Sequence, residues 1–452
     1  MKIGIIGGGP MGLALAYRLS VKGHKVTVFE REKQLGGLAT YHDFGAFYWD
    51  RFYHVILPSD RPLIGFLNEI GLGDKLRWAP TLTGFYVDGR FYSVSNSWEF
   101  LRFPLVSLWG KFRLILTLLY CSRIRDWQRL EKITVEDWLV KTCGRTTYEK
   151  MWKPLLLAKL GESYRRVSAV FIWTYISRLF SARDSSAQSK ESLGYVSGGY
   201  KTVWKRLEDL IRAADGEIRT GVSVRQIRPR SEGGLWVECE QNRDRFDKVI
   251  FTGPTNILQI VAARELLDVA SGGDAVEYLG VICMVLVTRR PLVPYYVVNI
   301  AEKRIPFTGI IGMSNLVAPE ETAGRCLTYL PKYVLSTDPL LQRPDDELRM
   351  LFFEGLGLMF PDLKTEDIEG AYINRAVKVQ PLQVLNYSSI VPKVATAHQD
   401  FFVLNTSQFV HGTLNNNEVI VAVNEFLKEY GSRFEEPSRA KQQTNTAKAV
   451  LA

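Results

Sequence analysis

Residues 2–30 read KIGIIGGGPMGLALAYRLSVKGHKVTVFE. The apolar, β-rich run Lys2–Ile6 predicts a buried strand, and the glycines after it end that strand. A helical pattern of apolar residues follows, and a second β-rich run, Lys25–Phe29, ends at the acidic Glu30. Strand, glycine turn, helix and strand in this order predict a βαβ unit with a right-handed crossover.

The glycines of this unit have the spacing GxGxxG, which suits a dinucleotide. Gly7 permits the tight turn, Gly9 lets the backbone approach a pyrophosphate, and Gly12 lets the helix pack closely on the strand. Pro10 and Met11 lie between these glycines at the helix start. The free N–H groups of a helix start favour an anion, so we expect the phosphates there.

Glu30 ends the second strand, where a carboxylate can accept hydrogen bonds from both hydroxyls of an adenosine ribose. A 2′-phosphate would be repelled at this position, which argues against NADP. The motif and its structural context occur in register, so we interpret them as a genuine nucleotide site. The unit alone does not separate FAD from NAD.

The segment after this acid favours FAD. Arg31 is followed by Gly36-Gly37 and the small-residue run that begins Leu38-Ala39. This segment resembles the second glycine pair of the flavin amine oxidase and protoporphyrinogen oxidase superfamily, in which the loop wraps back over the FAD pyrophosphate. The resemblance implies that these five residues bind FAD. A plain surface turn is the alternative for the two glycines.

The resemblance extends along most of the chain and implies an α/β fold. It consists of a Rossmann-like FAD-binding domain and an interleaved α+β substrate-binding domain with a helical part. The polar, repetitive C-terminus predicts a disordered tail. The expected limits are 1–55, 196–260 and 371–435 for the FAD-binding domain, 56–195 and 261–370 for the substrate-binding domain, and 436–452 for the tail.

The resemblance also implies that later segments of the chain contact FAD. Val224 resembles the valine whose backbone contacts the adenine, and Thr252 follows the strand that closes the cofactor domain. After the apolar strand Phe401–Leu404, a helix is predicted from Glu418, and in the superfamily its N–H groups stabilise negative charge on the reduced flavin. The residues implied near that edge of the flavin are Asn405, Thr406, Leu414, Asn415 and Asn416.

This last segment departs from the superfamily pattern. Thr406 stands where the usual acid is found, and no Trp or Tyr lies beside the helix start as in amine oxidases. The departure puts the aromatic cage for an amine in doubt. Elsewhere, local signals predict a hairpin at Tyr86–Tyr92, a helix capped by Thr134, and a helix at Thr202–Ala213.

The sequence names no obligatory catalytic base, since the flavin carries the hard step of a dehydrogenation. His54 lies where the superfamily's chain passes near the flavin, but a core or loop histidine is the preferred interpretation. His411 precedes the flavin-edge helix and is the stronger candidate. His42 and Lys159 are weaker candidates, and Arg51 remains open between a phosphate contact and a salt bridge.

The composition is that of an ordinary globular protein, with 46% hydrophobic and 23% charged residues. Five widely spaced cysteines without a CxxC pair offer neither a metal clip nor a disulfide framework, which favours the reducing cytoplasm. The apolar stretch Leu101–Cys121 contains cations, so a membrane-spanning helix is not expected. The net charge of +9 suggests an anionic partner or only a solvated basic surface, and no nucleic-acid motif accompanies it.

Apolar and basic residues alternate over Trp98–Arg129. In protoporphyrinogen oxidases the equivalent region docks on a membrane and forms a tunnel for an apolar substrate, which implies peripheral membrane contact here. The alternative is that these residues form the core of the substrate-binding domain.

Three functional hypotheses follow. The first is an FAD-dependent oxidoreductase that oxidises or desaturates an apolar or partly apolar small molecule by hydride transfer to flavin N5. The second is a mutase similar to UDP-galactopyranose mutase, which acts on a sugar nucleotide without net redox change. The third is a protein that binds flavin without turnover.

Overall fold

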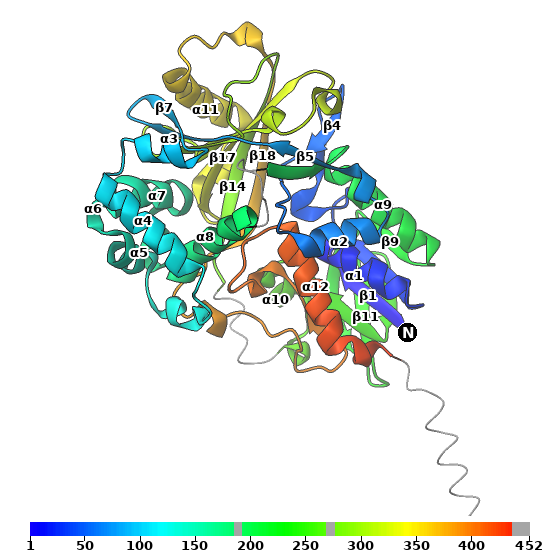
Figure 1. Cartoon of the computed structure of the whole chain (residues 1–452). Coiled ribbons are helices and arrows are strands. Elements are labelled where there is room, and N and C mark those ends of the chain that lie inside the picture. Colours follow the sequence, from blue (N-terminus) through cyan, green and yellow to red (C-terminus); the bar gives the residue numbers. More distant parts are fainter. Residues whose placement is uncertain (185–191, 268–275, 436–452) are drawn as a thin grey trace, which may run out of the picture.

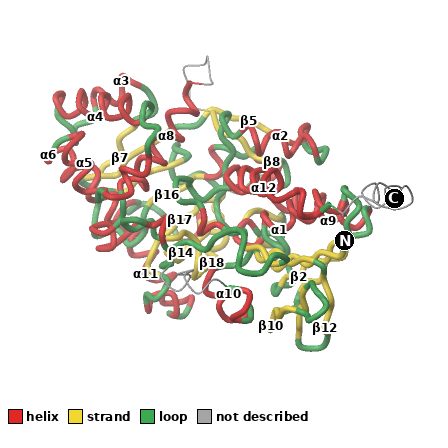
Figure 2. The backbone as a smooth tube through the Cα atoms, turned by 90° about the horizontal axis from the view of Figure 1, so that it is seen from below, coloured by secondary structure: helices red, strands yellow, loops and turns green. Residues whose placement is uncertain are grey.

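The computed structural model describes residues 1–184, 192–267 and 276–435, and the predicted tail at 436–452 lies outside these residues. The described chain has two parts, a nucleotide-type α/β part near the N-terminus and a second part built on a larger sheet (Figure 1). A group of helices extends the second part and lies at the end of the molecule opposite the N-terminus (Figure 2).

The first part is built on a five-stranded parallel sheet. Its strands are short, and all but one edge strand are mostly apolar, because both faces are covered. Ile5, Val28 and Phe402 on one face pack on helices, whereas Phe251 and Val403 on the other pack on a three-stranded meander. The strands, in order across the sheet, are β19 (Phe401–Val403), β13 (Lys248–Phe251), β1 (Lys2–Ile6), β2 (Lys25–Glu30) and β9 (Glu217–Thr220).

Helices α1, α2, α9 and α12 cover the first face, and the meander with α10 covers the second. Residues from distant parts of the sequence therefore meet around the predicted βαβ unit. The bounds are α1 (Pro10–Ser20), α2 (Arg61–Glu69), α9 (Gly199–Ala213), α10 (Thr255–Val261), α12 (Asn416–Tyr430), β10 (Val224–Pro229), β11 (Leu235–Cys239) and β12 (Arg243–Phe246).

The second part is built on a mixed seven-stranded sheet in which β14, the strand next to one edge, is buried along its whole length. Apolar residues of α11 (Asp345–Met359) pack on one face, and the other face bears a cluster that includes Trp49, Tyr296 and Tyr329. The strands in order are β18 (Ile368–Pro381), β14 (Tyr278–Thr288), β17 (Cys326–Leu335), β16 (Gly309–Gly312), β15 (Val297–Ile300), β6 (Thr83–Val87) and β7 (Arg90–Ser93).

One predicted domain limit is corrected by this sheet. The limit at 371 falls inside β18, which pairs with β14 from Ile368 to Pro381. The physical reason is the length of β14, whose backbone groups need a partner strand along the whole of one edge. The chain therefore returns toward the parallel sheet only after Pro381.

The helical part packs around its own apolar core. None of the helices in the described part of the chain combines the length and apolarity that a bilayer crossing requires. The remaining elements are α3 (Ser97–Arg102), α4 (Leu108–Cys121), α5 (Val135–Cys143), α6 (Arg145–Thr147), α7 (Lys153–Leu160), α8 (Ala169–Asp184), and the two-stranded pairs β3–β4 (Tyr41–Asp43, Tyr48–Asp50) and β5–β8 (Leu76–Pro80, Ser192–Val196).

The local predictions are confirmed apart from two helix starts. The hairpin turns at Asp88-Gly89, and the Thr134 side chain accepts a hydrogen bond from the Asp137 backbone at 3.1 Å. Helix α9 begins at Gly199 instead of Thr202, and α12 begins at Asn416 instead of Glu418. The α12 start moves because Asn415 is the residue whose side chain caps the helix, at Glu418 N–H.

Candidate flavin site

The turn between β1 and α1 has the geometry that its glycines predict. Gly7 has φ +118°, a conformation that L side chains rarely adopt. A Cβ on Gly12 would lie 1.9 Å from the Gly7 carbonyl oxygen, so only glycine permits this helix–strand contact. No side chain within the described residues caps the start of α1, where its N–H groups are available to an anion.

The second glycine pair lies against this turn. The Gly36 N–H donates to the Gly8 carbonyl at 2.9 Å, and a Cβ on Gly37 would lie 3.2 Å from the Gly9 Cα. Trp204 of α9 fixes the loop, since its indole N–H donates to the Ala39 carbonyl at 2.7 Å. The two glycine motifs are thus one backbone cradle.

Glu30 reaches into the same cradle. One carboxylate oxygen accepts from the Gly8 N–H at 2.7 Å, and the other accepts from the Glu32 N–H at 2.8 Å. Each oxygen retains a second acceptor position, which suits a ribose hydroxyl. Just before Val224, the Val222 N–H donates to the Glu30 carbonyl, which brings β10 to this end of β2.

Thr252 and Asn405 hold the cradle from neighbouring strand ends. The Thr252 hydroxyl donates to the Ile6 carbonyl at 3.0 Å, and the Asn405 amide donates to the Gly253 carbonyl at 2.9 Å. The hydrogen-bond donors of these two side chains are therefore already paired with backbone carbonyls of the protein. Of Thr252 and Asn405, the backbone groups are therefore the better candidates for a ligand.

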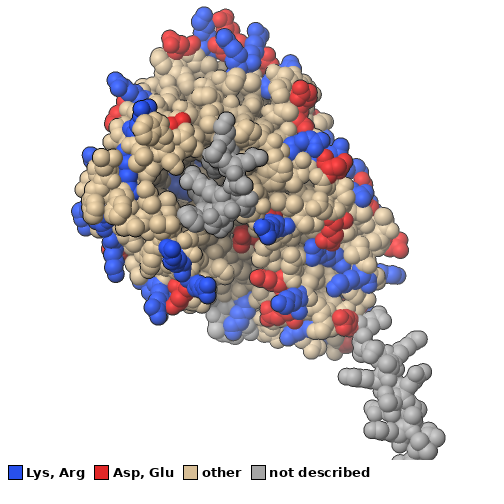
Figure 3. Space-filling model, viewed as in Figure 1, with Lys and Arg blue, Asp and Glu red and all other residues tan. Residues whose placement is uncertain are grey.

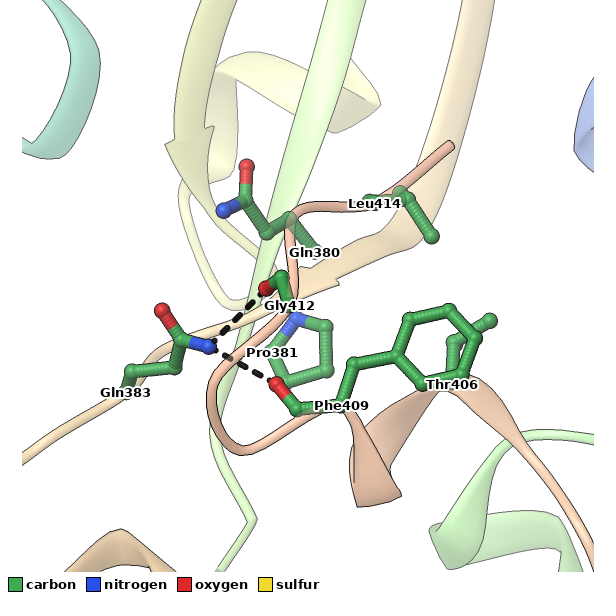
Figure 4. A pocket seen from close by; sticks show the side chains of 7 residues that line it. All are labelled: Gln380, Pro381, Gln383, Thr406, Phe409, Gly412 and Leu414. Carbon is green, nitrogen blue, oxygen red and sulfur yellow. Dashed lines mark hydrogen bonds between the residues drawn. The ribbon is translucent and has the colours of Figure 1, made fainter. Parts of the chain in front are cut away.

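The loop before α12 borders a small hollow (Figure 4). Gln383 fixes this loop by donating to the carbonyls of Phe409 at 2.8 Å and Gly412 at 3.3 Å. Thr406 and Leu414, both predicted near the flavin, line the hollow beside residues of β18. The complete lining is Gln380, Pro381, Gln383, Thr406, Phe409, Gly412 and Leu414.

Buried polar atoms beside the cradle indicate whether its residues suit FAD. The Tyr200 hydroxyl and Asn416 Nδ2 are buried and interact at most with each other among the described residues, whereas His54 Nδ1 lies 3.7 Å from a carboxylate oxygen of Asp50. Tyr200 and Asn416 line one hollow with Pro10, and the His54 ring lies 5.3 Å from that of Tyr200. Two buried polar groups, from α9 and α12, thus lie beside the start of α1. The phosphates and hydroxyls of FAD would satisfy such atoms, so the site fits the cofactor.

Several predicted residues do not reach this cradle with their side chains. Met11 is buried in the core, and the Arg31 guanidinium pairs with Glu32 in solvent. The His411 ring stacks on Trp127, 4.9 Å away at 16°, and so faces the helical part. Burial lowers the pKa of His411 and also that of His42. The His42 ring lies 5.0 Å from Tyr372 of β18.

The weaker candidate Lys159 lies in a second polar group. Its Nζ is 4.2 Å from the centre of the Tyr333 ring and 5.2 Å from that of Tyr175. The Tyr333 hydroxyl shares a hydrogen bond of 2.9 Å with the Tyr53 hydroxyl. The Tyr175 hydroxyl donates to Gln380 at 3.3 Å. We call these five residues the lysine–tyrosine cluster, which touches the hollow of Figure 4 through Gln380.

Sequence reasoning missed most of this second group and also Tyr200 and Trp204 as site residues. Tyr333 lies in an apolar strand and Tyr175 in an apolar helix, where an aromatic residue indicates core. The one available signal was a lysine near the end of an otherwise apolar helix, at Lys159.

Comparison with known proteins agrees with this geometry. A family model described as flavin-containing amine oxidoreductase matches residues 12–379. The chain belongs to this family. It is an FAD-dependent oxidoreductase, and the expected cofactor is confirmed.

Individual relatives of this oxidoreductase are distant. The carotenoid phi-ring synthase of Streptomyces griseus is 24% identical over 59% of this chain, and the chain spans 55% of its length. A provisional protoporphyrinogen oxidase from Exiguobacterium sp. 255-15 has a TM-score of 0.75 at 16% identity, covering 95% of this chain and 98% of that one. Reduced UDP-galactopyranose mutase has a TM-score of 0.65 at 14% identity, covering 94% and 95%. The structures share the fold.

Proposed function

We propose that this oxidoreductase oxidises or desaturates an apolar or partly apolar small molecule. The observation that carries the proposal is the aromatic face of the seven-stranded sheet. Phe44, Tyr296 and Tyr372 belong to one apolar cluster on this face, which continues to the segment around Tyr53. When bound, FAD supplies two-electron oxidation by accepting a hydride at N5. The protein side chains orient the substrate and exclude water.

We also propose which residues hold the cofactor. The backbone of the two glycine motifs would bind the pyrophosphate, and Glu30 the adenosine ribose. Polar atoms farther along FAD would form hydrogen bonds with Tyr200, His54 and Asn416. We do not assign His411 a catalytic role, because its ring is held against Trp127.

The proposal is tested by anaerobic mixing of the FAD-loaded protein with candidate substrates. Protoporphyrinogen, a linear polyene and a hydrophobic amino acid represent the apolar class. Bleaching of the visible flavin band by at least one such compound is the expected result. Activity that appears only after dithionite reduction, on a sugar nucleotide and without net oxidation, would instead establish the mutase alternative. That alternative has the likeness to UDP-galactopyranose mutase in its favour.

Access for an apolar substrate is proposed through α3 and α4. Large apolar side chains on α4 face outward at helical spacing, and Trp109 is 68% exposed. This outer stripe therefore does not belong to the core, although Phe103 and Leu114 do. The exposed members are Trp98, Leu101, Leu108, Trp109, Phe112, Ile115, Leu116, Leu119 and Tyr120.

We propose that this stripe contacts an anionic lipid surface. Figure 3 shows a mostly uncharged region on this side, bordered by Lys and Arg. Arg123 and Arg125 follow α4 and are exposed, which complements lipid phosphates. Trp109→Ser should weaken sedimentation with phosphatidylglycerol vesicles about tenfold, as expected for one large apolar side chain. Ile260→Ser, at an exposed apolar residue on α10, is the matched control and should change nothing.

A further inference from the structure

We propose that Lys159 binds a carboxylate group of the substrate. The inference rests on the proposed function and adds a substrate class to it, an apolar molecule that bears one negative charge. It is carried by a half-buried ammonium group that lies over tyrosine rings and not beside a carboxylate.

Lys159 has no counter-ion among the side chains that the structure describes. Within residues 1–178, 192–267 and 276–435, no carboxylate forms an ion pair with Lys159, whereas the neighbouring Lys153 on the same helix pairs with Glu149 at 2.8 Å. Ring faces attract a cation only modestly. A cation far from bulk water is costly unless an anion accompanies it.

The site remains partly accessible. Lys159, Tyr53, Tyr175 and Tyr333 are each only half-buried, as expected of residues that line a space instead of filling a core. Burial alone would lower the pKa of Lys159, but the phenols of Tyr175 and Tyr333 outweigh burial and raise it. The side chain is therefore cationic at neutral pH.

The position of the cluster connects it to the flavin half. Tyr175 donates to Gln380, and Gln380 lines the hollow that Thr406 and Leu414 share. On the other side, Tyr53 follows Asp50, whose backbone carbonyl accepts from the Tyr329 hydroxyl at 2.6 Å. An anion held at Lys159 would fix one end of a substrate whose apolar body lies along the aromatic face.

The number of charges favours a carboxylate over a phosphate. The cluster has one cation, and its other groups are neutral hydroxyls and one amide. One ammonium group balances a monoanion, and the hydroxyls can donate to its oxygens. A phosphate dianion would retain an unbalanced charge in the same place.

The test measures binding of decanoate to the FAD-loaded protein, followed by the change in the visible flavin spectrum. The wild type should bind decanoate more tightly than decanamide or decyl phosphate. Lys159→Met should raise the Kd for decanoate at least about 30-fold, as expected when one partner of a desolvated ion pair is lost. Lys159→Arg should retain most of the affinity. The matched control is Lys150→Met, at an exposed lysine nine positions earlier in the chain, which should leave the Kd for decanoate unchanged.

Tyr333→Phe keeps the test decisive if Lys159→Met does not fold. It removes only a hydroxyl and should weaken decanoate binding about fivefold, the effect of one hydrogen bond. Equal affinity of wild type and Lys159→Met for decanoate would overturn the proposal, as would tighter binding of decyl phosphate or decanamide. A protein that holds FAD and is bleached by a substrate but shows any of these results refutes the lysine site alone. If no candidate substrate reduces the flavin of the wild type, the proposed function itself is wrong.

Discussion

The glycine cradle and the lysine–tyrosine cluster are built in opposite ways. The cradle uses backbone groups of two short motifs, Gly7–Gly12 and Gly36-Gly37, each compact in sequence. The cluster uses side chains that only the folded chain brings together, since Tyr53 and Tyr333 are 280 positions apart. On the proposed assignment, local geometry would hold the cofactor, and long-range packing would determine what binds beside it.

The largest expected effect breaks the cradle itself. Gly12→Ala places a Cβ 1.9 Å from the Gly7 carbonyl oxygen, and both groups are backbone-fixed. We expect a loss of about 3 kcal/mol in the free energy of unfolding, together with loss of bound FAD. Urea denaturation and the flavin content of the purified protein measure both. Gly65→Ala on α2, where a Cβ meets no neighbour, is the control and should not destabilise.

A second substitution in the same turn should change the affinity for FAD without changing the stability of the fold. A Cβ on Gly9 would meet only the Gly37 Cα, at an ordinary 3.9 Å. Gly9→Ala should thus leave the unfolding free energy unchanged but raise the Kd for FAD at least about tenfold, or about 1.4 kcal/mol, because the pyrophosphate must approach this backbone. Unchanged affinity in a fluorescence titration with FAD would mean that the phosphates lie elsewhere.

The cluster is tested by a double-mutant cycle on its tyrosine pair. Tyr53→Phe or Tyr333→Phe alone leaves the partner hydroxyl without its bond and should cost about 1 kcal/mol. The double variant should cost less than the sum of the two, because no orphaned hydroxyl remains. Additive values in urea denaturation would show that the two hydroxyls do not interact.

The same contrast explains what the sequence could predict. Gly7 and Gly12 have roles that follow from spacing alone, and both were confirmed by backbone geometry. Strand β12 was missed because Arg243-Asp244-Arg245 is charged, although it pairs with β11 at the edge of a meander. The start of α12 was placed two residues late because three consecutive asparagines can each cap a helix.

The substrate side could not be predicted in this way. Tyr333 looks like a core residue of an apolar strand, and nothing near it in sequence indicates that Lys159 lies over its ring. His411 was favoured because it adjoins the flavin-edge helix, but the loop turns its ring onto Trp127. Direction of a side chain out of a loop depends on tertiary packing, which local sequence does not encode.

The smallest expected effect concerns an ion pair that ties the helical part to the large sheet. Arg166 donates to Glu277, just before β14, at 2.6 Å, and this hydrogen bond lowers the pKa of Glu277. Both side chains are nearly half exposed, at 48% and 45%, so solvent weakens the pair and Glu277→Gln should cost less than about 1 kcal/mol at neutral pH.

The pH dependence gives the sign of this effect. The folded-state pKa of Glu277 lies below its unfolded value, so the ionised carboxylate stabilises the fold above the unfolded pKa, and this contribution is lost as the pH falls through the folded value. The difference between wild type and Glu277→Gln should therefore vanish in strongly acidic solution. Glu162→Gln, whose partner Arg165 lies three residues away in solvent, should show a smaller difference at neutral pH. A cost that persists unchanged in acid would mean that Glu277 contributes through packing and not through its charge.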